Sequence, residues 1–199
     1  PQDEFIGMLK IADSFDLVKL TADFSKAVVE KLKAHELFSD AELEKFKDSE
    51  EIDSIKTFVN EHHAEGLYHM GELVGCVKRA HEVDSSLTAH IMFENLVVKA
   101  SGVLAVKHLM KNSSVKADEV EYVIECSEEA CGDMNQRGGG NFAKSIAEFA
   151  GLENATGSDI RGFCAAPSHS LLAASSLVAA GTFKNILVVA GGCTAKLGM

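Results

Sequence analysis

Apolar residues in the first third of the chain recur at three- and four-residue spacing, which is the repeat of an amphipathic helix. Over residues 1–60 this repeat predicts three helices. The first ends near Phe38, the second begins at the capping-box sequence Ser39–Glu42 and reaches about Lys47, and the third covers Ile52–Glu61. The apolar stripe of the first helix consists of Leu17, Leu20, Phe24, Val28, Val29 and Leu32.

The helical repeat stops at residues 67–81, where two short apolar runs flank a glycine. A β-hairpin is the simplest interpretation, with Leu67–His69 and Leu73–Val77 as its strands and Gly71 in the turn. Cys76 lies in the second strand, and we expect it to be a small buried residue rather than a nucleophile.

A longer helical repeat and a following apolar run predict half of a crossover unit. The helix extends from about His90 to Asn112 and has basic residues in its last turns, where they complement the helix dipole. After a polar loop, Val120–Glu125 is expected to be a strand. A second helix, Asn141–Ala150, is expected to end at Gly151.

The segment between that strand and that helix, CSEEACGDMNQRGGGN, contains three consecutive glycines. A phosphate-binding loop is conceivable, because the segment leads into a helix N-terminus and helix N-termini bind anions. However, the segment matches no nucleotide-binding glycine motif, and its acidic residues would repel a phosphate. We therefore expect a loop at a subunit contact, with no nucleotide or other cofactor bound.

The last third of the chain has the pattern strand, cysteine, helix, glycine, strand. Asp159–Phe163 is extended, and Cys164 stands where the extended run gives way to a helical one. Pro167 suits a first helical turn, and Gly181 suits the left-handed position after a helix end. Ile186–Ala190 is typical of a central parallel strand covered on both faces. The pattern predicts a βαβ crossover with a thiol at its elbow.

The helix after this cysteine carries no charge, since residues 162–183 contain no Asp, Glu, Lys or Arg. A helix that is apolar or small on all sides is usually buried. A membrane span is the alternative, but Pro167, His169 and four serines argue against it. We therefore expect a buried core helix and no membrane association.

Composition narrows the classes of partner. Hydrophobic residues make up 46% and charged residues 25% of the 199 residues, as in ordinary soluble proteins, and the net charge of −11 disfavours nucleic acid and anionic membranes as partners. Five cysteines without a secretory signal indicate reduced thiols in the cytoplasm. His62 and His63 are adjacent, so their side chains diverge, and no metal site is predicted. The abrupt ends of the chain suggest a piece of a longer polypeptide.

Cys164 is the candidate catalytic residue. A helix N-terminus stabilises a thiolate, and its unpaired N–H groups can hold the oxyanion that forms when the thiolate attacks an acyl carbonyl. The alternative is a structural cysteine in a tight turn. His169 lies about one and a half helical turns further on and is expected to point away from the cysteine, so the activating base is expected outside this chain.

The order of these elements resembles the nucleophile region of thiolase-fold condensing enzymes, notably ketoacyl-acyl-carrier-protein synthase III. Within that superfamily, the motifs ECSEEACGDMNQRGGGNFAKSIAEFAG, NATGSDIRGFCAAPSH and VVAGGCTAKLGM resemble the β subunits of component C of glycine/sarcosine/betaine reductase. Two upstream motifs, DEFIGMLKIADSFDLV and VGCVKRAHEVDSSLTAHIMFENLVVKASGVLA, resemble the same family, so the likeness covers essentially the whole chain.

The resemblance implies an α/β fold that forms the N-terminal half of a thiolase-like domain. Its sheet would be mixed and largely parallel, with helices on both faces. The expected organisation is a helical N-terminal region at 1–63, a hairpin and connector at 64–90, and the first half of the thiolase-like domain at 91–199. The second half would carry the His/Asn or His/His partners of Cys164, so this chain alone is expected to be inactive.

The resemblance also implies a role in acetyl transfer. Component C of the family takes an acetyl unit from the carboxymethyl group on a selenoprotein, component A, and releases it to phosphate as acetyl phosphate. Cys164 matches the acyl-accepting cysteine of the superfamily, and the implied partners are the α subunit, component A, phosphate and a second copy in a dimer. A scaffold or docking subunit of the same complex and a condensing enzyme that forms carbon–carbon bonds are the alternatives.

Overall fold

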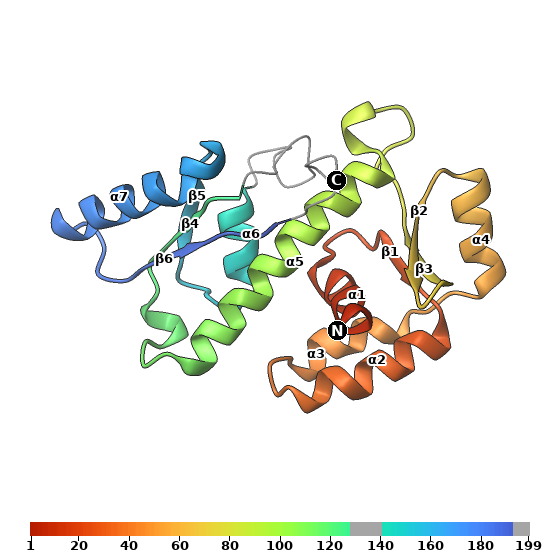
Figure 1. Ribbon diagram of the computed structural model, residues 1–199. Helices are drawn as coiled ribbons and strands as arrows, with labels where there is room; N and C mark the ends of the chain where they lie inside the picture. The colour runs from red at the N-terminus through yellow and green to blue at the C-terminus, as the bar shows by residue number, and fades with distance from the viewer. Residues whose placement is uncertain (128–140, 193–199) are drawn as a thin grey trace. The chain divides into compact units, whose positions relative to one another are not determined.

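The computed structural model describes residues 1–127 and 141–192 (Figure 1). Its helices accompany two three-stranded sheets, so the fold is mixed α/β as expected. The chain divides into two compact units, Pro1–Leu96 and Val97–Met199, and the helix α5 (Ala89–Asn112) runs from the first unit into the second.

The first unit contains a small antiparallel sheet with strand order β1-β3-β2. Its strands and helices, in chain order, are α1 (Gln2–Ala12), β1 (Val18–Leu20), α2 (Ala22–Ala34), α3 (Asp40–Glu44), η1 (Lys45–Lys47), α4 (Ile52–Glu61), β2 (Glu65–His69), β3 (Glu72–Val77) and η2 (Ser85–Leu87). The predicted hairpin is confirmed as β2 and β3, and Gly71 adopts φ +84° in its turn, a conformation that favours glycine.

Two of the helices predicted in this unit are confirmed, although the one predicted to reach about Lys47 is α-helical only to Glu44 and continues as the 3₁₀ helix η1. Ser39 and Glu42 form the expected capping box, in which the Glu42 N–H donates to Ser39 Oγ and the Ser39 N–H donates to the Glu42 carboxylate. The helix α4 covers Ile52–Glu61 and packs over β3, where Ile55, Ala64 and Cys76 form a buried apolar cluster.

The helix expected to carry Leu17 and Leu20 begins later than predicted. Val18–Leu20 is instead the strand β1, and the helix α2 starts at Ala22 and ends at Ala34. Lys19 pairs with Cys76 of β3, and Val18 and Leu20 pair with the residues on either side of it. The apolar residues of β1 are therefore buried by pairing with a strand more than 50 residues later in the sequence. Leu17 and Leu20 are three residues apart, as on a helix, but Leu20 belongs to the strand β1 and Leu17 directly precedes it.

The second unit is built on a parallel sheet with strand order β5-β4-β6, where β4 is Tyr122–Glu125, β5 is Thr156–Asp159 and β6 is Ile186–Val189. The helix α6 (Phe142–Phe149) packs over β5 and β4, and the helix α7 (Ala166–Ala179) packs over β6 and β4 (Figure 1). The β4–α6–β5 crossover and the β5–α7–β6 crossover run in opposite directions across the sheet, so right-handed connections place α6 and α7 on opposite faces. The predicted βαβ unit is confirmed as β5, α7 and β6.

Three details of this unit differ from the sequence prediction. The strand β5 is Thr156–Asp159, so it shares only Asp159 with the extended run predicted at Asp159–Phe163. The apolar run Ile186–Ala190 forms β6, which lies at an edge of the described sheet with alternate residues only half-buried. The central strand is β4. Its consecutive residues Val123 and Ile124 point to opposite faces of the sheet and are 0% and 1% exposed, so β4 is buried on both faces.

The charge-free helix α7 is more exposed than predicted. Its buried residues are Ala166, Ser170 and Ala174, which repeat every four positions and form one narrow stripe against the sheet. Leu171 and Leu172 are 59% and 68% exposed. The expectation of burial on all sides is therefore wrong for the part of the chain that the structure describes.

The helix α5 is the one helix of the described residues that is long and apolar enough to cross a membrane. Its most apolar stretch has a mean hydropathy of 1.3, and 61% of that stretch is buried inside the protein. A largely buried core helix meets the same criteria of length and composition, so this finding is weak support for a membrane span.

Candidate functional site

The predicted elbow forms a sharp turn between β5 and α7. Phe163 adopts φ +50°, a left-handed conformation that costs a residue with a side chain about 1–2 kcal/mol. Cys164 follows it in the 3₁₀ helix η4 (Phe163–Ala165), and the Ala165 N–H donates to the Gly162 carbonyl at 3.1 Å. The turn leaves the Cys164 side chain exposed just before α7 begins.

The helix that follows the elbow starts as predicted but one residue further from the cysteine. Ala165 is the N-cap of α7, Pro167 lies in its first turn, and Gly181 ends it with φ +71°. Cys164 therefore precedes the N-cap and does not stand in the first turn of the α-helix itself.

His169 lies against the backbone of the elbow. A Cβ atom built on Gly162 would be 3.2 Å from His169 Cδ2, so the imidazole ring covers the Gly162 side of the turn. The ring thus packs on the backbone before the cysteine, and a side chain at position 162 would have to displace it.

An ion pair between the buried Glu125 and the partly exposed Arg161 lies at the carboxyl end of the sheet, beside the strand that enters the elbow. Glu125 is completely buried, and its carboxylate accepts from Arg161 Nη1 at 2.5 Å and from the Ser127 N–H at 2.8 Å. The Ser127 hydroxyl also donates to Glu125 and accepts from the Gly191 N–H at 2.9 Å. Arg161 Nη2 lies 3.3 Å from Asp159. The ends of all three parallel strands are thereby joined in one polar network.

Asp159 also closes the N-terminus of α6. Its carboxylate accepts from the Phe142 N–H at 3.1 Å and from the Ala143 N–H at 2.9 Å, while Asn141 Oδ1 accepts from the Lys144 N–H at 2.6 Å. These first-turn N–H groups are the donors that would otherwise bind an anion. A carboxylate of the chain itself therefore takes the position considered for a phosphate at the start of this helix.

Gly191, two residues after the end of β6, joins this edge of the sheet to α5. A Cβ atom on Gly191 would lie 2.0 Å from the Val98 carbonyl oxygen, so the close approach of the two backbones requires glycine. The next N–H, of Gly192, donates to Ser101 Oγ at 3.0 Å.

Cys126 follows β4 at the same edge but differs from Cys164 in its surroundings. Its side chain is buried, its Sγ lies 3.5 Å from the Val189 carbonyl, and burial raises the pKa of the thiol. A buried thiol with a raised pKa is a poor nucleophile at neutral pH. Of the cysteines that the structure describes, Cys164 is thus the exposed one.

The loop expected at a subunit contact begins at Cys126 and extends to Gly140. Its residues 128–140 lie outside the described part of the chain, as does Cys193, so the prediction for that loop stays a prediction.

Taken together, these residues occupy the carboxyl edge of a parallel sheet, at the ends of strands whose connections leave toward opposite faces. Such edges are where open α/β sheets bind their ligands. Cys164 and His169 were identified in this region from the sequence, whereas Glu125, Ser127 and Arg161 were not. A charged residue that directly ends a predicted apolar strand, as Glu125 does, was the available signal.

Comparison with known proteins identifies one relative along the whole chain. The chain is 55% identical over its 199 residues to the glycine/sarcosine/betaine reductase complex component C subunit beta of Peptoclostridium acidaminophilum, and it spans 39% of that protein's length. No protein-family model matches the chain, and no solved structure matches it. The resemblance drawn from the sequence motifs is confirmed, while the thiolase-like architecture stays a prediction.

Proposed function

We propose that this chain is part of a component C β subunit of a glycine/sarcosine/betaine reductase complex, and that Cys164 accepts an acetyl group in that complex. The observation that carries the proposal is the 55% identity over the full chain to such a subunit. The exposed position of Cys164 at a strained strand-to-helix elbow supports the assignment of the acyl acceptor, because backbone strain of this kind concentrates at active sites.

In the proposed step, the Cys164 thiolate attacks the acyl carbon and a tetrahedral oxyanion forms. When that carbon belongs to acetyl phosphate, its bond to the phosphate oxygen breaks, and S-acetyl-cysteine and inorganic phosphate are the products. The reverse step forms acetyl phosphate: a phosphate oxygen attacks the thioester carbonyl and the thiolate leaves. At the start of α7 the Ala165 and Ala166 N–H groups donate to the carbonyls of Gly162 and Phe163, and Pro167 has no N–H, so we propose that the donors that stabilise the oxyanion come from elsewhere in the complex.

The polar network at the ends of β4 and β5 would position the segment that leads to the cysteine without reacting itself. Arg161 is held by Glu125 and Asp159, so its charge is engaged three residues before Cys164. This arrangement fixes the strand that delivers the thiol to the edge of the sheet. We propose that the residues that activate the thiol come from outside this chain.

The partners follow from the same proposal. They are the α subunit of component C, the selenoprotein component A as the source of the acetyl unit, and phosphate as its acceptor. A cytoplasmic location and a dimer belong to the proposal as well.

The test is to incubate the intact component with radiolabelled acetyl phosphate and to locate the label by peptide mapping. Label is expected on the Cys164 peptide and absent from the Cys126 peptide, because the Cys126 thiol is buried and its pKa is raised. Replacement Cys164→Ala should abolish the label, whereas Cys126→Ala should retain it. Both substitutions are small, so a thermal unfolding curve close to the unmodified protein's is expected for each.

A scaffold or docking subunit is the second candidate. The observation that favours it is the mutual pairing of Glu125, Arg161 and Asp159, which engages the charge of Arg161, three residues before Cys164, with carboxylates of the chain itself. Label on the α subunit and not on Cys164 would establish the scaffold and reject the carrier. Acetyl transfer to an acyl thioester with formation of a carbon–carbon bond would instead identify a condensing enzyme.

A further inference from the structure

A slot of about 320 Å³ lies beside β6 in the second unit, toward the amino ends of the strands and away from the elbow. Consecutive residues of a strand point to opposite faces of a sheet, and three consecutive residues of β6 line the slot. The slot therefore lies at the edge of the sheet. The lining residues that matter here are Leu109 and Met110 of α5, Val178 of α7, and Ile186, Leu187 and Val188 of β6.

The slot at β6 is flanked by helices from both faces of the sheet. The helix α5 packs on the same face as α6, because a Cβ atom on Gly102 would lie 2.6 Å from Ile146 Cδ1. The helix α7 covers the opposite face. A strand placed in the slot would contact Leu109 and Met110 on one face and Val178 on the other. The strand that fits must therefore be apolar on both faces.

The edge of β6 along the slot has backbone groups that the described residues leave unpaired. The Val189 carbonyl accepts from the Cys126 N–H of β4's end at 2.9 Å, so Val189 faces β4. Backbone groups alternate in direction along a strand, which turns the N–H and C=O groups of Ile186 and Val188 toward the slot. No described strand pairs with this edge. Ile186–Val189 also contains no charge and no proline, the features that commonly protect a free edge.

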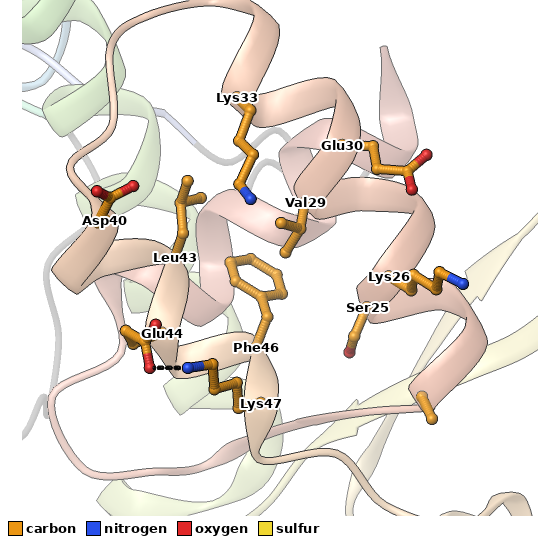
Figure 2. Close-up of a pocket in the computed structure, with 11 residues that line it drawn as sticks. Ser25, Lys26, Val29, Glu30, Lys33, Asp40, Leu43, Glu44, Phe46 and Lys47 are labelled. Carbon is orange, nitrogen blue, oxygen red and sulfur yellow. Dashed lines mark ion pairs between the residues drawn. The ribbon is translucent and has the colours of Figure 1, made fainter.

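A pocket in the first unit shows how this slot differs from an ordinary surface hollow (Figure 2). That pocket has a volume of about 470 Å³ between α2 and the α3–η1 segment, and charged side chains of both segments surround it. Glu44 pairs with Lys47 at its rim, at 2.5 Å. Among the described residues that line the slot at β6, Lys184 is the one that carries a charge. The apolar slot is thus the better candidate for a protein interface.

We propose that β6 of a second copy of this chain occupies the slot, so that two β6 strands pair antiparallel and join two sheets into one. The sequence of β6, Ile-Leu-Val-Val, is itself apolar on both faces. With a two-fold axis at Leu187, Ile186 of one copy lies opposite Val188 of the other, and each such pair exchanges both of its hydrogen bonds. Lys184 then lies opposite Ala190 of the other copy, so like charges do not meet.

The helix α7 suits the same arrangement. It packs over both β4 and β6, so its axis lies near the gap between these two strands. Neighbouring strands are about 4.8 Å apart, which places the two α7 helices of the joined sheet roughly 10 Å apart, a distance at which helices pack. The helix contains no Asp, Glu, Lys or Arg, and Val178 on its slot side is 45% exposed. The two helices therefore meet without burying a formal charge.

This inference rests on the dimer of the proposed function and supplies an interface for it. It does not depend on acetyl transfer. Labelling of Cys164 tests the transfer and sedimentation tests the interface, so either proposal can fail while the other holds.

The test is sedimentation velocity of the chain between about 1 and 200 µM, where a dimer with a dissociation constant of about 1–50 µM is expected. Val188→Pro removes an N–H that points into the slot and keeps the bonds of its neighbours to β4, so it should weaken dimerisation at least about 20-fold. Its circular dichroism in dilute, monomeric solution should match that of the unmodified protein.

A matched pair of variants on α7 locates the interface without proline. Val178→Lys places a charge on the slot side, whereas Leu172→Lys places the same charge about 120° around the helix, opposite the buried stripe of Ser170 and Ala174. Val178→Lys should weaken the dimer at least about tenfold and Leu172→Lys by less than about twofold.

Three results would each overturn the inference. The first is a monomer at about 200 µM. The second is a dimer that Val188→Pro leaves intact or that the two lysine variants weaken equally. The third concerns hydrogen exchange in a complete β subunit: protected Ile186 and Val188 amides in a monomeric subunit would assign the slot to a further segment of the same polypeptide.

Discussion

The cysteines that the structure describes differ in how far they are buried. Cys76 is completely enclosed between α4 and the hairpin, and desolvation raises the pKa of its thiol to about 11. Cys164 is exposed at the elbow. The sequence distinguished these two residues correctly, because a cysteine inside an apolar strand and a cysteine at a strand-to-helix junction have different neighbours along the chain.

The pH dependence of stability should show the burial of Cys76. Its pKa of about 11 in the folded state lies above the ordinary value of 9.0, so the folded state keeps its proton between pH 9 and 11 while the unfolded state loses it. The contribution to stability is therefore complete below pH 9 and is lost as the pH rises through 11.

Between pH 8 and 10 the free energy of unfolding should fall by about 1 kcal/mol more in the unmodified protein than in Cys76→Ala. Urea unfolding at both pH values measures this difference. Parallel pH profiles of the two proteins would contradict the expected role of the thiol.

Removal of Arg161 should show how much the buried, unpaired carboxylate of Glu125 lowers the free energy of unfolding. The variant Arg161→Met leaves Glu125 charged, buried and paired only with Ser127, which should lower the free energy of unfolding by about 3 kcal/mol. The double variant with Glu125→Gln should recover more than half of this loss, because the uncompensated charge is gone.

Urea denaturation at neutral pH is the measurement for these variants. The matched control is Lys56→Met, which breaks the exposed pair with Asp53 and should change stability by less than about 0.5 kcal/mol. A loss in Arg161→Met no larger than in the control would show that the Glu125 carboxylate reaches solvent.

The pair formed by Glu125 and Arg161 illustrates a limit of sequence analysis at the residue scale. The two side chains belong to different strands, and they meet because β4 and β5 pair in parallel with Glu125 opposite Asp159. The local pattern of polar and apolar residues predicts where the strands are, but it does not predict which residues of two strands lie opposite each other. The elbow cysteine could be identified in advance because strand, cysteine and helix are consecutive in the chain.

At the scale of elements, predictions succeeded where the determining contacts are local. The capping box of α3 involves residues three positions apart, and the hairpin turn is set by Gly71. The strand β1 was mistaken for helix because its character depends on β3, whose Gly75 pairs with Leu20. Apolar residues at helical spacing cannot reveal a partner strand located elsewhere.

The capping box should account for measurable stability. Ser39→Ala removes the acceptor for the Glu42 N–H and should lower the free energy of unfolding by about 1 kcal/mol. Ser54→Ala, a substitution inside α4, should be neutral or slightly stabilising because alanine is the better helix former. Thermal unfolding followed by circular dichroism compares the two variants, and equal effects would reject the capping role.

At the scale of the whole molecule, the apolar character of α7 did not predict its burial. The rule that a helix apolar on all sides is buried assumes that elements on every side are present. The described sheet covers only the stripe formed by Ala166, Ser170 and Ala174. Composition therefore identified the helix and its place in the crossover, but it did not establish which of its faces the chain covers.

The uncovered face of α7 should contribute measurably to the apolar surface of the described residues. Replacing Leu171 and Leu172 together by Gln should lower the fluorescence of a bound hydrophobic dye such as ANS, and it should change the free energy of unfolding by less than about 1 kcal/mol, because both side chains are mostly exposed.

The control is Leu187→Gln in β6, a buried position where the same change should destabilise by about 3 kcal/mol. Unchanged dye binding in the double variant would show that another surface is responsible. Dye fluorescence and urea denaturation together separate the two effects.

The strand order β5-β4-β6 has a consequence for how the chain folds during synthesis. The central strand β4 is made first of the three, yet its pairing of Tyr122 with Ile186 needs a strand that leaves the ribosome last. Until β6 is made, one edge of β4 has no partner strand and its apolar residues are not covered on that side. Parallel pairing of strands that are far apart in the sequence forms slowly. The hairpin of the first unit, by contrast, can close as soon as Val77 has emerged. Translation speed between residues 125 and 189 should therefore influence how much of this protein reaches its native state.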